Sequence, residues 1–111
     1  MPSGDQVRPK KWKQISVLFD DDSSSVISGF YADGTRPSLG IRWNGAEGEL
    51  GFPNVVGKPI WHVVPDFLAI PILLGLLAEL AGRPDPSSTR FVQRIRRQLL
   101  AQYTAQIDDA G

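Results

Sequence analysis

The apolar residues of this chain follow one period in its first half and another in its last third. Leu39, Ile41 and Trp43 alternate with polar or small residues, which is the two-residue period of a strand with one buried face. The segment 67–81 is apolar except for Glu79, is too long and too Leu-rich for a strand, and predicts a helix. This order indicates an α+β fold: an antiparallel four- to five-stranded meander followed by two C-terminal helices packed on one face.

Segments with the composition of strands occupy most of the chain upstream of the helical pattern. They run over residues 12–19, 26–32, 38–44 and 47–52, with 60–64 as an optional fifth. In the first of them, Ile15, Val17 and Phe19 are expected to share one face of the sheet.

The dipeptide Asn44-Gly45 directly follows the third of these segments. It is typical of a two-residue type I′ hairpin turn, because both central residues of that turn need positive φ. The returning strand would then be Glu47 to Phe52. In this arrangement Trp43 lies on the helix-covered side of the sheet and belongs to the core.

Two helices are predicted after the strands. The first ends at Gly82 and contains Pro71, so the regular helix is expected to begin near Ala69, since an interior proline loses a hydrogen bond. The alternative is a short turn capped by Asp66 with a kink at Pro71. The second helix is expected to be capped within residues 87–89 and to run to about residue 106.

The composition points to one small domain. The 111 residues carry zero formal net charge and no cysteine, so disulfides and thiolate sites are excluded and global attraction to nucleic acid or anionic lipid is not expected. No apolar segment is long enough to span a membrane, and no secretory signal is present, which favours a cytoplasmic location without membrane contact. We expect a flexible N-terminal tail at 1–11, a single α+β domain at 12–107 and a frayed C-terminus at 108–111.

Few residues have the spacing of a catalytic or metal site. His62 is the only histidine, whereas zinc sites use three or four ligands; acid–base work with Asp66 is the alternative to a structural role. The carboxylates at 20–22 lack the spacing of a calcium loop and indicate a solvated turn. Glu47 and Glu49 would share a strand face, as a catalytic pair or as ordinary exposed residues. No catalytic, cofactor-binding or metal-ligating residue is therefore predicted, and no cofactor.

The first helix is unusual because leucine and isoleucine lie around most of its circumference. A surface helix needs an apolar stripe on one side only. Pro71, Gly75 and Ala78 cluster on one narrow side, where a neighbour could approach closely. Burial in the core and contact with another chain are both compatible with this pattern.

The second helix carries a stripe of arginines, Arg90, Arg94 and Arg97, which we predict to be a partner-binding surface. Arginines at helical spacing bind carboxylates or phosphates, and the three tryptophans could stack on bases.

The residues alone do not determine a function. The leading hypothesis is a small non-catalytic interaction module of bacterial type that self-associates or binds a protein partner. One alternative is a nucleic-acid-associated accessory protein that uses the Arg-rich last helix. Another is a small-ligand binder or enzyme with a cleft between sheet and helices.

Overall fold

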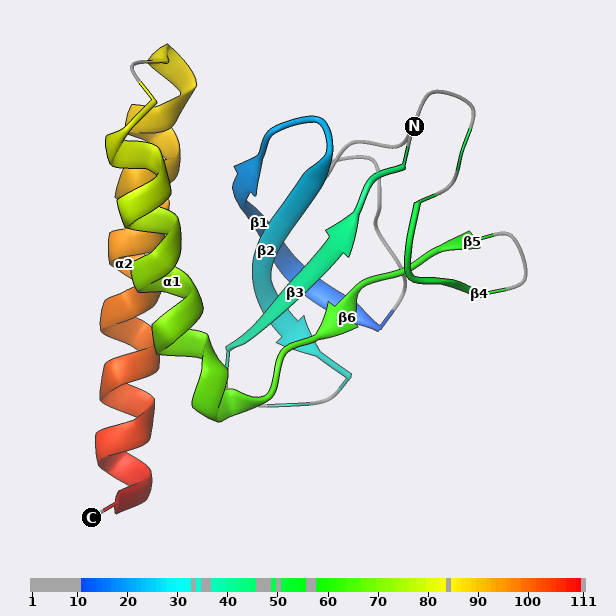
Figure 1. Cartoon of the computed structure of the whole chain (residues 1–111). Coiled ribbons are helices and arrows are strands. Elements are labelled where there is room, and N and C mark those ends of the chain that lie inside the picture. Colours follow the sequence, from blue (N-terminus) through cyan, green and yellow to red (C-terminus); the bar gives the residue numbers. More distant parts are fainter. Residues whose placement is uncertain are drawn as a thin grey trace. The chain divides into compact units, whose positions relative to one another are not determined.

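The structure is a computed structural model of the chain, and it describes residues 11–32, 34, 37–45, 49, 51–55, 58–83 and 85–110. Its elements are, in order, β1 (Trp12–Asp20), β2 (Ser24–Tyr31), β3 (Ser38–Trp43), β4 (Asn54–Val55), β5 (Lys58–Pro59), β6 (His62–Val63), α1 (Asp66–Ala81) and α2 (Pro86–Ala110). Figure 1 shows the strands followed by the two helices. The α+β class with an antiparallel four-stranded sheet and two C-terminal helices is thereby confirmed.

The chain forms two compact units, residues 1–64 and residues 65–111. The first holds the strands and the second holds the helices. Whether 12–107 acts as one domain with the helices on one sheet face stays a prediction. The predicted tail at 1–11 lies, apart from Lys11, outside the described residues.

The main sheet of the first unit has the strand order β1-β2-β3-β6, with every neighbouring pair antiparallel. The first three strands form the predicted meander. The fourth place belongs to β6, within the segment predicted as an optional fifth strand. Between β3 and β6 the chain forms a separate two-stranded hairpin, β4-β5, which the sequence pattern did not predict.

Strand β1 does not keep a strict alternation. Its pairing with β2 shifts twice, once between Lys13 and Ser16 and once between Val17 and Phe19. Each shift is a β-bulge or similar irregularity, which changes the face toward which the following side chains point. The prediction that Ile15, Val17 and Phe19 share one face is therefore wrong, since Val17 and Phe19 pair with the adjacent β2 residues 27 and 26.

The packed core of the first unit contains Trp12, Ile27 and Trp61, all buried. Gly40 of β3 makes this packing possible, because a Cβ at that position would lie 3.0 Å from the Cβ of Trp61 and 3.1 Å from Trp12 Cζ2. The Trp12 ring also packs at a tilt on Tyr31, with ring centroids 5.3 Å apart.

This core is not on the face that the sequence indicated. Leu39 is buried and Ile41 half-buried, but Trp43 is 54% exposed. The prediction of Trp43 as a core residue is wrong. The residues that alternate with these, Gly40 and Arg42, are both buried, so the polar and small side of β3 is packed at these two positions.

The prediction of a tight turn at Asn44-Gly45 is also wrong. Such a turn would pair Trp43 with the residue three positions further on, whereas its N–H donates to the Phe52 carbonyl at 2.8 Å and its carbonyl accepts the Phe52 N–H at 2.7 Å. Gly45 does have the expected positive φ, 83°. Apart from Glu49, Gly51 and Phe52, the predicted returning strand 47–52 lies outside the described residues.

Helix α1 begins at Asp66 without a side-chain cap and continues through Pro71 to Ala81. The prediction of a start near Ala69 is wrong: the helix accommodates the proline one and a half turns from its start, where it leaves only the carbonyl of Phe67 without its usual partner. The predicted end at Gly82 is confirmed.

Helix α2 begins at Pro86, so the predicted caps at 87–89 lie inside it. Proline favours the first helical position because its missing N–H would be unpaired there anyway. The helix extends to Ala110, beyond the predicted end near residue 106. Within the second unit α1 and α2 lie side by side and run in opposite directions (Figure 1). Among the described residues, neither helix combines the length and the apolar character needed to cross a membrane.

Candidate binding site

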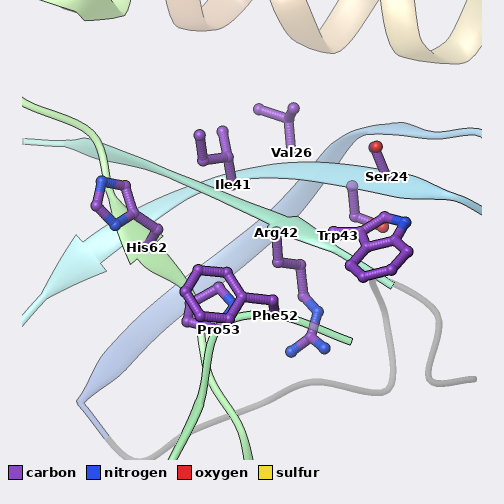
Figure 2. A pocket seen from close by; sticks show the side chains of 9 residues that line it. Ser24, Val26, Ile41, Arg42, Trp43, Phe52, Pro53 and His62 are labelled. Atoms are coloured by element: carbon purple, nitrogen blue, oxygen red, sulfur yellow. The ribbon is translucent and has the colours of Figure 1, made fainter. Parts of the chain in front are cut away.

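The first unit contains an open hollow of about 550 Å³ on the sheet, a size within the range of small-molecule and side-chain binding pockets. It is mostly apolar and is lined by Ser24, Ser25, Val26, Ile41, Arg42, Trp43, Phe52, Pro53 and His62. In the view of Figure 2, His62 and Trp43 lie at opposite ends of this lining, with Phe52 and Pro53 between them.

Strand register explains why these side chains meet. Ser24 pairs with Trp43, Val26 with Ile41, and Ile41 with His62. Directly paired residues of antiparallel strands point to the same face. Residues from β2, β3 and β6 thus form one continuous wall.

The second wall of the hollow contains Phe52 and Pro53. It forms because the pairing partner along the outer edge of β3 changes. Up to Ile41 this edge pairs with β6, but Trp43 pairs with Phe52. The chain between Phe52 and β6 makes the β4-β5 excursion at this point. Phe52 is 65% exposed, so both aromatic side chains joined by this bridge remain accessible.

Arg42 lies where the pairing changes. Its side chain is buried, and its Nη1 donates to the carbonyl of Ile60 at 3.0 Å. The guanidinium carbon also lies 6.0 Å from the ring centroid of Trp61, within the range of a cation–π contact. Burial lowers the pKa of Arg42 from its ordinary value. Arg42 thus binds the chain at Ile60, directly after the β4-β5 hairpin.

A small polar network supports the hollow from the other side of β3. Asn44 is fully buried; its Oδ1 accepts the Ser25 hydroxyl at 3.0 Å and its Nδ2 donates to Asp20 Oδ1 at 3.4 Å. The Asn44 N–H donates to the Ser23 carbonyl at 2.7 Å. These contacts with β1, β2 and their turn use the groups of Asn44 that a local hairpin turn would have left in solvent.

The three aspartates form the turn that the sequence predicted. Asp21 Oδ1 accepts the N–H of Ser23 at 3.1 Å and that of Ser24 at 2.8 Å. Asp20 Oδ1 accepts the N–H of Asp22 at 3.0 Å. Carboxylates that accept backbone N–H groups are typical of Asx turns, and among the described residues no cluster of three metal-ligating side chains exists.

The other residues considered from the sequence are dispersed. His62 is exposed at the wall of the hollow, Glu49 is exposed, and Glu47 lies outside the described residues. In the second unit Arg90 and Arg97 are exposed, while Arg94 is half-buried and engaged in a contact. The predicted stripe therefore offers two exposed guanidiniums, and its role in binding stays a prediction.

Sequence reasoning missed Arg42, Phe52 and Pro53 as parts of one site. A glycine in the interior of a strand, as at Gly40, is a signal of close approach by another part of the chain. The signal at Gly40 indicates which side of β3 is packed. The other side of the strand is therefore the one that carries the hollow. No local signal connects Phe52 with Trp43, because the two residues lie nine positions apart in the sequence.

Comparison with known proteins identifies no relative: no family model, no curated protein and no solved structure matches the chain.

Proposed function

We propose that the chain is a non-catalytic interaction module that binds an apolar segment of a protein partner in the hollow on its sheet. The observation that carries this proposal is the pair of exposed aromatic residues, Trp43 and Phe52, joined by two backbone hydrogen bonds. Tryptophan and other aromatic residues are enriched among the side chains that dominate protein–protein binding energy.

The geometry favours binding energetically. The backbone under both rings is held by pairing, so little main-chain entropy is lost when a partner docks. Covering two large aromatic rings removes apolar surface from water, which stabilises a complex by roughly 25 cal/mol per Å².

The tryptophans also support a protein partner over a nucleic acid. Trp12 and Trp61 belong to the packed core and cannot stack on bases without disrupting it. Only Trp43 remains accessible, and the hollow beside it is mostly apolar. Nucleic-acid binding normally combines stacking rings with a basic groove.

Affinity capture from the source cell tests the proposal with three baits: the wild type, a Trp43→Ser/Phe52→Ser variant, and a Leu100→Ser control that alters an exposed apolar residue on α2. We expect a protein that is retained by the wild type and the control after nuclease treatment and lost by the double variant. Circular dichroism confirms that each bait is folded. Equal retention by all three baits, or retention that nuclease removes, would contradict the proposal.

A further inference from the structure

The dipeptide Asn44-Gly45 does not form the hairpin turn that is typical of its composition. Asn44 is instead fully buried, and its amide hydrogen-bonds to Ser25 and Asp20, which lie 19 and 24 positions earlier in the chain. The asparagine is thus held by contacts with β1 and β2 within the first unit.

The glycine of the pair is held by a different contact. Gly45 has a φ of 83°, a left-handed conformation that favours glycine. A Cβ at Gly45 would also lie 2.7 Å from the backbone nitrogen of Gly51 and 2.9 Å from its Cα, closer than Cβ atoms come to backbone. Two long-range constraints therefore place an asparagine directly before a glycine.

This order of residues has a chemical consequence, because asparagine is thermolabile and a following glycine leaves its own nitrogen sterically open. The Gly45 nitrogen can bond to Asn44 Cγ and lose its proton, while the Cγ–Nδ2 bond breaks and Nδ2 leaves as ammonia. Water then opens the resulting cyclic imide at either carbonyl, which gives aspartate or isoaspartate.

The folded sheet opposes each of these steps. The Nδ2 that must leave donates to Asp20 at 3.4 Å, and the Oδ1 on the same carbon accepts the Ser25 hydroxyl at 3.0 Å. The main chain is fixed as well, since the Asn44 N–H donates to the Ser23 carbonyl at 2.7 Å. Asn44 is 0% exposed, so the water that the reaction consumes does not reach it.

We propose that Asn44 is a deamidation site controlled by the fold: its hydrogen bonds to Ser25 and Asp20 suppress the reaction, and local opening at 44–45 permits it. Parts of a folded protein open individually, at free energies up to that of global unfolding. When closing is faster than the chemistry, the reaction rate follows the population of the open form. The proposal concerns the first unit alone and does not depend on what the hollow binds.

The reaction is one-way because neither product restores the network. In aspartate a carboxylate oxygen takes the place of Nδ2 and faces the Asp20 carboxylate, so repulsion between like charges replaces a hydrogen bond at a buried position. Isoaspartate lengthens the main chain by one carbon at the point where Gly45 packs against Gly51. Deamidation therefore weakens the part of the sheet that carries Trp43.

Mass spectrometry of the full chain, incubated at mildly alkaline pH with and without guanidinium chloride, measures the reaction at Asn44. Asn54, the other asparagine, precedes a valine and serves as an internal reference. Asn44 should react faster than Asn54 in denaturant, and at least about tenfold more slowly in the folded chain than in denaturant. Equal rates at Asn44 in both solutions, or an Asn44 as inert as Asn54 in denaturant, would overturn the proposal.

A variant tests whether the network is responsible. Ser25→Ala removes the hydroxyl that holds Oδ1, so the folded chain should deamidate about threefold faster or more, with no change in denaturant. Ser28→Ala alters another buried serine of β2 and should react as the wild type does. Circular dichroism confirms that both variants are folded. A Ser25→Ala chain that reacts no faster than Ser28→Ala would overturn the control by the network, and the wild-type comparison needs no variant.

The product is tested by direct substitution. Asn44→Asp should lower the urea midpoint of unfolding. The double variant Asp20→Asn/Asn44→Asp exchanges amide and carboxylate and should regain most of that loss, because the two side chains can again share a hydrogen bond. A wild-type midpoint for Asn44→Asp, or no recovery in the double variant, would overturn the one-way character of the reaction.

Discussion

One face of β3 is buried at Gly40 and Arg42 although its side chains are small or polar, while the apolar face is buried at Leu39 and exposed at Trp43. Gly40 and Arg42 point toward the densely packed side and are buried, while Trp43, the largest apolar residue of the strand, is half-exposed on the other. Hydrophobicity alone would place them the other way round. The difference teaches that a strand face becomes core where large partners can reach it, and at Gly40 two tryptophans can.

A tryptophan lies on each side of β3, which allows the two sides to be tested with the same residue type. Trp61→Ala, with Trp61 only 3% exposed, should lower the free energy of unfolding by about 3–5 kcal/mol, because it leaves a cavity in the core. Trp43→Ala should lower it by less than about 1 kcal/mol. Urea unfolding measures both, and equal losses would show that the exposed face carries as much packing as the buried one.

A second test adds volume instead of removing it. Gly40→Val places methyl groups where Trp61, Ile27 and Trp12 already lie 3.0–3.1 Å from an added Cβ. We expect a loss of about 3 kcal/mol from overpacking. Ile41→Val, one residue along and on the other face, should cost about 1 kcal/mol or less. If both substitutions are equally mild in thermal melting, the close approach at Gly40 is not a constraint.

The polar part of the packed face gives a smaller effect. Asn44→Ala removes the acceptor of the Ser25 hydroxyl and leaves that buried group unsatisfied, at a cost of about 1–2 kcal/mol. Ser24→Ala, an exposed neighbour, should change the free energy of unfolding by less than about 0.5 kcal/mol. A neutral Asn44→Ala variant would mean that the network contributes no stability.

The smallest expected effect concerns the accessibility of the tryptophans and leaves the fold unperturbed. Trp43→Phe should change the free energy of unfolding by less than about 0.5 kcal/mol, yet remove most of the tryptophan fluorescence that acrylamide quenches, because Trp12 and Trp61 are buried. Quenching titrations on the wild type and the variant provide the measurement. Strong residual quenching in the variant would show that the supposed core tryptophans are accessible.

Part of the fold follows directly from local patterns. Alternation predicted β3, a β-prone run predicted β2, the turn residues at 20–22 predicted the connection of β1 to β2, and the long apolar segment predicted α1. Each of these depends on contacts among residues near in sequence or on the period of one element. The candidate site did not follow in this way, since Phe52 and His62 reach β3 from distant segments.

The errors have a common cause. Asn44-Gly45 has the composition of a hairpin turn, but hydrogen bonds from Asn44 to residues about twenty positions earlier outcompete that local preference. Pro71 disfavours a helix locally, yet α1 continues through it. In both cases long-range contacts or a long helix outweigh a preference that favours the alternative by only a few kcal/mol.

Three features follow from the residues alone: the order and type of the main elements, the absence of a thiol site and the unusual apolar circumference of α1. Long-range packing determines where each face of β3 is buried, which tryptophan is exposed, and that Trp43 and Phe52 lie together beside a hollow. The physical reason is that periodicity records how side chains alternate within one element, whereas burial depends on which distant side chains have room to arrive. On β3, Gly40 supplies that room, and its effect is visible only once Trp12 and Trp61 are in place.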